Sequence, residues 1–88
     1  MKRNIASKTI ILYVLELVKK GSGKNYPISY TSIANVLNSI GVKCERRTVS
    51  RNVQYLIDFG EPIIKVEGRG CYYNHDGKRE VKIFQEEQ

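Results

Sequence analysis

Residues 45–59 read ERRTVSRNVQYLIDF, and this stretch carries the patterns of two helical faces. Apolar side chains stand at positions 49, 53, 56 and 57, the spacing of one buried face of a helix. A second set recurs at i, i+3, i+4 and i+7 on a different face: Arg47, Ser50, Arg51 and Gln54. Solvated helices usually interleave arginine with glutamate four residues away. Here the acidic residues, Glu45 and Asp58, stand at the two ends. We therefore predict a helix over about residues 45–59 with an uncompensated cationic stripe.

Two further helices are predicted before this stretch. The first covers about residues 7–20 and carries two neighbouring apolar stripes, at positions 11, 14, 15 and 18 and at positions 10, 13 and 17. Its apolar surface is wider than a small core needs, so we expect either packing on two sides or contact with a second copy of the chain. The second helix covers about residues 30–40, with Ser29 as its N-cap and its apolar face at positions 33, 36, 37 and 40. Gly41 is expected to end it in a left-handed conformation.

A β-hairpin is predicted over about residues 63–74. The segment 63–67 reads as a strand, Gly68-Arg69-Gly70 as a tight turn, and 71–74 as a returning strand rich in β-forming residues. Residues 80–84 read as a further strand, and Pro27-Ile28 as a short extended piece. Three helices followed by a hairpin give a fold of the α+β class.

The length of the chain limits the number of domains, and its net charge indicates the class of partner. The chain has 88 residues, which predicts a single domain over residues 1–88. Its formal net charge of +6 favours a polyanionic partner, namely nucleic acid, an acidic protein face or anionic lipid.

The residue types give little support for a metal site, a redox pair, a secreted or membrane protein, or an enzyme. Cys44 and Cys71 are too few and too far apart for a zinc ribbon or a redox pair, so we expect reduced thiols and a cytoplasmic protein, with a disulfide between them left open. The basic start and apolar run of residues 1–15 are interrupted by Glu16 before a secretory signal is complete, and no segment is long and apolar enough to span a membrane. We find no nucleophile–base pair, metal cluster or cofactor motif. No enzymatic activity, metal, cofactor or small-molecule ligand is expected.

Three segments and one further residue together resemble the winged helix-turn-helix module of bacterial repressors: Glu45 to Val53, Leu56, Phe59 to Ile63, and Gly68 to Tyr73. The similar groups are the DeoR-type and WYL-domain regulators and the N-terminal domain of the biotin repressor. The resemblance implies a winged helix-turn-helix fold, with residues 45–59 as the recognition helix and residues 63–74 as the wing. The chain departs from the pattern at Glu45, where the family usually has serine, and at Asn52, where it usually has aspartate. The family's second, ligand-sensing domain is not expected here.

The resemblance and the cationic stripe together predict sequence-specific binding to double-stranded DNA by a small transcriptional regulator of the repressor kind. The first helix is the candidate surface for a homodimer. An alternative is a protein-interaction adaptor or inhibitor on the same scaffold, which the carboxylate of Glu45 and the missing second domain motivate. The residues expected to contact bases or phosphates are Arg46, Arg47, Ser50, Arg51 and Gln54 of the recognition helix, Arg69 of the wing, and, as further backbone contacts, Lys43, Lys65 and Tyr30.

Overall fold

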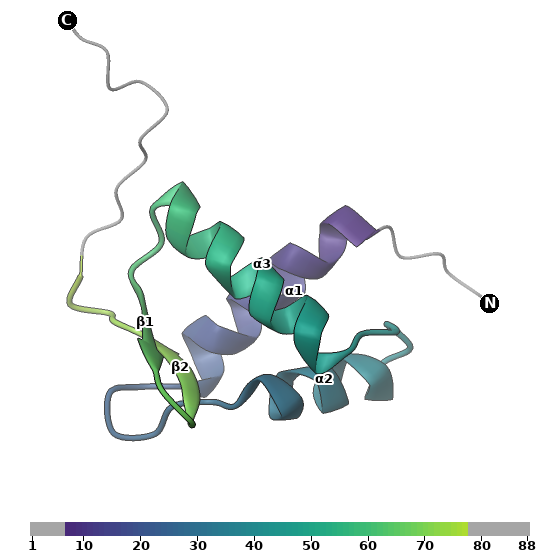
Figure 1. Cartoon of the computed structure of the whole chain (residues 1–88), viewed down its shortest axis with the longest axis horizontal. Helices are drawn as coiled ribbons and strands as arrows, with labels where there is room; N and C mark the ends of the chain where they lie inside the picture. The colour runs from purple at the N-terminus through teal and green to yellow at the C-terminus, as the bar shows by residue number, and fades with distance from the viewer. Residues whose placement is uncertain (1–6, 78–88) are drawn as a thin grey trace, which may run out of the picture.

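The computed structural model describes residues 7–77 and shows three helices followed by an antiparallel β-hairpin (Figure 1). This is a small α+β domain, compatible with a winged-helix layout. The elements in chain order are α1 (Ser7–Gly21), α2 (Tyr30–Ser39), α3 (Arg46–Phe59), β1 (Ile63–Val66) and β2 (Gly70–Tyr73). Their bounds confirm the predicted helices and hairpin to within a residue or two. The strand expected over residues 80–84 lies outside the described residues.

None of the helices within residues 7–77 combines the length and the apolar character that crossing a membrane requires.

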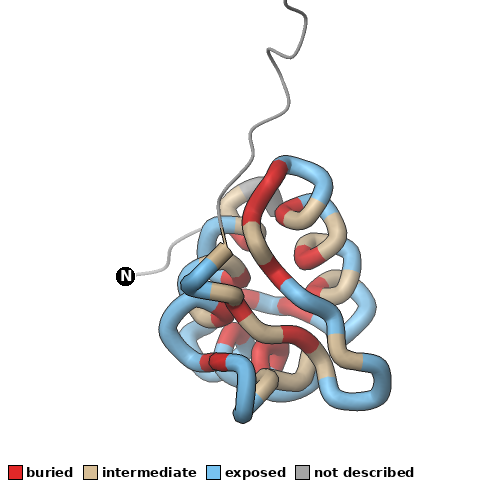
Figure 2. The backbone as a smooth tube through the Cα atoms, turned by 90° about the vertical axis from the view of Figure 1, so that its left-hand side faces the viewer, coloured by how far each residue is buried: buried red, intermediate tan, exposed pale blue. Residues whose placement is uncertain are grey.

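The core lies between the three helices and the inner face of the hairpin. α3 packs against both α1 and α2, while β1 packs on α3 and β2 packs on α1. Figure 2 shows the buried stretches of the different elements gathered in the interior. The predicted inner face of α3 is confirmed, because Val49, Val53 and Leu56 are buried and Ile57 is half-buried. The other buried apolar residues are Ile10, Val14, Val18, Ile33, Ala34, Leu37, Val42, Cys44, Ile63, Cys71 and Tyr73.

The apolar face predicted for α1 is confirmed in large part, whereas that of α2 needs correction. On α1 the first predicted stripe is buried or half-buried against the core throughout (Ile11, Val14, Leu15 and Val18). Of the second stripe, Tyr13 is exposed. On α2 the buried set is Ile33, Ala34 and Leu37, and the two outer positions, Val36 and Ile40, are exposed. The small side chain of Ala34 allows close packing there, so the buried face of α2 turns toward Ala34 and leaves Val36 and Ile40 outside.

Glycines end both α2 and α3. Gly41 has φ +90° and Gly60 has φ +118°, the left-handed conformation predicted for Gly41. The next residue in each case donates its N–H five residues back: Val42 to the carbonyl of Leu37 at 2.9 Å, and Glu61 to the carbonyl of Leu56 at 3.0 Å. This is the Schellman arrangement, which satisfies the last carbonyls of a helix and turns the chain sharply. The two turns start the connections that lead to α3 and to β1.

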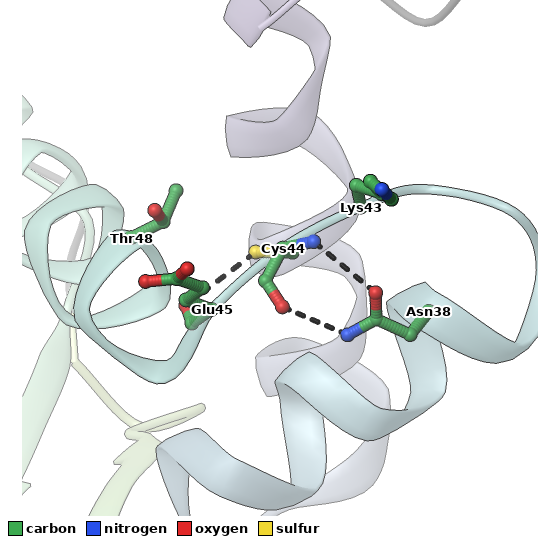
Figure 3. A pocket seen from close by; sticks show the side chains of 5 residues that line it. All are labelled: Asn38, Lys43, Cys44, Glu45 and Thr48. Carbon is green, nitrogen blue, oxygen red and sulfur yellow. Dashed lines mark hydrogen bonds between the residues drawn. The ribbon is translucent and has the colours of Figure 1, made fainter.

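The side chain of Asn38 holds the connection between α2 and α3 (Figure 3). Its Nδ2 donates to the carbonyl of Cys44 at 2.8 Å and to that of Ala34 at 2.7 Å. Its Oδ1 accepts the N–H of Cys44 at 3.3 Å. One amide therefore joins the end of α2 to Cys44, two residues before the start of α3. Helical periodicity gives no signal for this role of Asn38.

The strand β2 is paired on both edges. On one side it pairs with β1 in the register Ile63↔Tyr73 and Lys65↔Cys71. On the other side Ile28 exchanges two backbone hydrogen bonds with Cys71, of 2.8 and 3.0 Å, which confirms the extended piece at Pro27-Ile28. The two cysteines are free, so the disulfide left open by the sequence is not formed.

Ser22 ties the end of α1 to the same strand. Its buried hydroxyl donates to the carbonyl of Val18 at 2.6 Å and accepts the N–H of Tyr73 at 3.1 Å. The position of the hairpin is therefore fixed by α1 as well as by the segment around Ile28.

Gly70 is the position where the hairpin approaches the backbone of Ile28 most closely, and we predict that Gly70→Ala is strongly destabilising. Its φ is +109°, and a Cβ atom would lie 1.9 Å from the carbonyl oxygen of Ile28. We expect a loss of roughly 3 kcal/mol in the free energy of unfolding, measured with urea. The matched control is Gly68→Ala, where φ is +77° and nothing lies within 4 Å of the added Cβ. That change should cost only about 1–2 kcal/mol, and equal losses for both variants would contradict the close approach.

The Asn38 contacts yield a second prediction for stability. Asn38→Ala removes three hydrogen bonds at the α2–α3 connection and should lower the free energy of unfolding by about 1–3 kcal/mol. Asn35→Ala is the control, because Asn35 is exposed on the same helix and makes no side-chain hydrogen bond to another residue of the described part. It should change stability by less than about 0.5 kcal/mol. Similar unfolding midpoints for the two variants would show that Asn38 does not hold the connection.

Candidate nucleic-acid interface

The first half of α3 carries the strongest unbalanced charge that the described residues offer. Arg46, Arg47 and Arg51 are exposed, and Arg47 and Arg51 lie on the side of the helix opposite its buried seam. Within residues 7–77 the structure gives none of them an ion pair or a side-chain hydrogen bond; the salt bridge in this range, Lys20 to Glu16 at 2.6 Å, lies on α1. Ser50 is half-buried beside them. These guanidinium groups are therefore available to an external anion.

The second half of α3 has a different character. The Nε2 of Gln54 donates to Oδ1 of Asp58 at 2.9 Å, and the Oε1 of Gln54 accepts a hydrogen bond from Nζ of Lys65 on β1. The structure thus brings together two of the predicted site residues, Gln54 and Lys65, and joins them to a carboxylate. The charges of Lys65 and Asp58 offset each other, so the free positive charge of the helix is concentrated in its first half.

A second basic cluster lies where the hairpin turn meets the start of α2. An open hollow of about 250 Å³ is lined by Ser29, Tyr30, Thr31, Arg46, Val66, Gly68, Arg69 and Gly70. It brings together three predicted site residues that are far apart in sequence: Tyr30, Arg46 and Arg69. Like the arginines of α3, Arg69 is exposed and has no ion pair with another residue of the described part.

The start of α2 adds further groups suited to an anion. Ser29 caps the helix, accepting the N–H of Ser32 at 3.0 Å. The free backbone N–H groups and the dipole of a helix start favour negative charge. Burial, and secondarily the proximity of Cys71, raise the pKa of the Tyr30 phenol, which like any phenol is protonated at neutral pH and can donate a hydrogen bond. Two guanidinium groups, a helix start and a phenol make this cluster well suited to a phosphate.

The turn before α3 carries mixed charge. A hollow of about 540 Å³ is lined by Asn38, Lys43, Cys44, Glu45 and Thr48 (Figure 3). Glu45 occupies the N-cap position of α3, but its side chain makes no capping hydrogen bond, and it is exposed next to Arg46. Lys43 is also exposed. The carboxylate of Glu45 counters the charge of Lys43, so this part of the surface is a weaker site for an anion than the two arginine clusters.

The thiols and the histidine do not form a reactive site. Burial raises the pKa of the Cys71 thiol to about 11 and also raises that of Cys44, so both are protonated at neutral pH and are poor nucleophiles. The ring Nε2 of His75 lies 3.0 Å from the carbonyl oxygen of Lys19. Among residues 7–77 no group of three or more His, Cys, Asp or Glu side chains is placed to hold a metal ion.

Comparisons of the chain with protein-family models, with curated proteins and with solved structures find no match in any of the three. The function is therefore inferred from the surface chemistry of the described residues.

Proposed function

We propose that this chain binds double-stranded DNA sequence-specifically as a winged helix-turn-helix domain, with α3 as the recognition helix and the β1–β2 hairpin as the wing. The observation that carries the proposal is the set of exposed arginines without ion pairs in the first half of α3. The element order, with two helices joined by a short turn and a hairpin after the second, supports it.

The charge distribution favours one way of docking. The major groove of B-form DNA admits one α-helix, and the first residues of a recognition helix usually reach the base edges. Arg47 and Arg51 lie one helical turn apart on the outward face, and each guanidinium group can bridge O6 and N7 of a guanine. Arg46 and Arg69, beside the start of α2, would then hold a backbone phosphate. The balanced second half of α3 would lie outside the groove.

The biological role that fits this binding mode is that of a small transcriptional regulator acting as a repressor. A homodimer through α1 would let two recognition helices read two half-sites about one turn of DNA apart. The outer side of α1 supports this pairing, because Leu12 is 63% exposed there and lies beside Tyr13, Thr9 and Glu16 around a shallow hollow of about 350 Å³.

A second candidate function is that of a protein-interaction adaptor or inhibitor whose arginine face meets an acidic partner. Two observations favour it. Glu45 places a carboxylate beside the arginines, where it would repel a phosphate. Val36 and Ile40 expose apolar surface on α2 that the DNA-binding mode does not use.

The main test is the substitution of the two outward arginines. A duplex is first selected from a random pool, and its binding is then measured by fluorescence anisotropy at several salt concentrations. Arg47→Ala and Arg51→Ala should each weaken binding by about 1–3 kcal/mol and relax the preference at one base pair if they bridge a base. An arginine that instead meets a phosphate should reduce the salt slope by about one when it is removed.

The control for this test is Lys20→Ala, which removes the same charge from α1 rather than from α3 and should have a smaller effect. Unchanged affinity for both arginine variants would contradict the proposed face. If no duplex binds at low salt and an acidic protein partner binds instead, the second candidate is favoured.

The homodimer is tested separately by sedimentation. Leu12→Glu places a charge on the outer side of α1 and should shift the protein from dimer to monomer, because burying an unpaired carboxylate is costly. Ile40→Glu is the matched control, since Ile40 is 56% exposed on α2. It should leave the dimer intact. A monomeric unsubstituted protein at high concentration would contradict the role of α1.

A further inference from the structure

The amide of Gln54 is engaged at both of its ends. Its Nε2 donates to Oδ1 of Asp58 at 2.9 Å, and its Oε1 accepts from Nζ of Lys65. Asp58 lies one helical turn further along α3, whereas Lys65 lies on β1. This chain of hydrogen bonds therefore crosses from the recognition helix to the wing.

The register of the hairpin explains why Lys65 reaches α3. Alternate residues of a strand point to the same face, so Lys65 shares the face of Ile63, which is buried against the core. Its partner across the hairpin, Cys71, is also buried. A lysine can lay its aliphatic stem along such a surface and keep its ammonium group in solvent. Here the ammonium group ends at Gln54, on the outer side of α3.

This arrangement restricts the orientation in which Gln54 could read a base. A glutamine recognises adenine by accepting from N6 with its oxygen while donating to N7 with its nitrogen. In this structure a cation takes the oxygen and a carboxylate takes an N–H group. Hydrogen bonds with a charged partner are stronger than those between neutral groups. One N–H and one oxygen lone pair of the amide stay free, but an adenine would have to accept the orientation in which Lys65 and Asp58 hold the amide, or displace them.

We propose that Gln54 is a positioning residue, which couples the wing to the recognition helix and holds Lys65 for contact with a backbone phosphate. This inference rests on the proposed DNA-binding function. An ammonium group has three donors, and Gln54 takes one of them, so two stay available for phosphate oxygens. Asp58 fixes the other end of the amide, and thereby the direction in which the oxygen of Gln54 points.

The experiment compares Gln54→Met, Lys65→Met and the double variant with the unsubstituted protein. Methionine keeps an unbranched chain of similar length but cannot replace either hydrogen bond. Binding is measured on the selected duplex, at several salt concentrations, and on a panel of its single-base variants. Gln54→Met should weaken binding to every duplex by the same factor, roughly 3- to 10-fold, because it releases Lys65 without touching a base. Lys65→Met should lower the salt slope by about one, and the double variant should be no weaker than Lys65→Met.

Two results of the binding measurements would overturn the proposal. If Gln54→Met relaxes the preference at a single base pair while the salt slope is unchanged, Gln54 reads that base. If the effects of the two single variants multiply in the double variant, Gln54 and Lys65 act independently.

A measurement on the free protein separates this proposal from the proposed function. The same four proteins are unfolded in urea without DNA, and a non-additive shift of the midpoint in the double variant is expected from the contact between Gln54 and Lys65. Additive shifts would overturn the coupling between wing and helix even if DNA binds. If the coupling is present but no duplex binds the unsubstituted protein, the proposed function fails, and the phosphate role of Lys65 fails with it.

Discussion

Burial of the inner seam of α3 is the constraint on which the rest of the surface depends. Val49, Val53 and Leu56 are enclosed by α1 and α2, and the full burial of each such side chain contributes about 1.5–3 kcal/mol. Rotating the helix would expose this seam and bury guanidinium groups without partners, which is costly. The helix is therefore held in one orientation. Arg47 and Arg51 face solvent because the opposite side of the helix, which carries Val49, Val53 and Leu56, has to stay buried.

That orientation becomes a usable site only because the neighbouring segments are fixed as well. Asn38 closes the connection between α2 and α3 through backbone groups at both of its ends. The hairpin is held by the pairing of Ile28 with Cys71 and by the buried hydroxyl of Ser22. These polar contacts bring Arg69 beside Arg46 and the start of α2, residues that are far apart along the chain.

The charge of the surface is not uniform. The arginines in the first half of α3 have no acidic partner among the described residues, whereas the second half carries the balanced set of Lys65, Gln54 and Asp58. A long polyanion lying across this face would meet its strongest attraction at the start of α3 and at the tip of the hairpin. Coulombic attraction to exposed arginines is screened by salt, so such binding would depend strongly on ionic strength.

The order, type and approximate bounds of the three helices and the hairpin could be predicted from the amino-acid sequence alone. Helical periodicity, glycines at helix ends and β-forming residues are local signals, and they agree with one another here. The inner seam of α3 and its outward arginines could be read in the same way, because they follow from the spacing within one helix. The DNA-binding role itself stays a proposal that the exposed arginines support.

The exact set of buried positions on α1 and α2 could not be predicted before the packing of the elements was known. Both helices carry more apolar positions than one face holds, so the choice depends on the neighbours, and Val36 and Ile40 were wrongly assigned to the core. The contacts of Asn38 with Cys44 and of Gln54 with Lys65 could not be predicted from the sequence either. Each contact joins two segments that are brought together only when the chain folds. Periodicity shows what a single element prefers, whereas packing decides which of those preferences are satisfied at the same time.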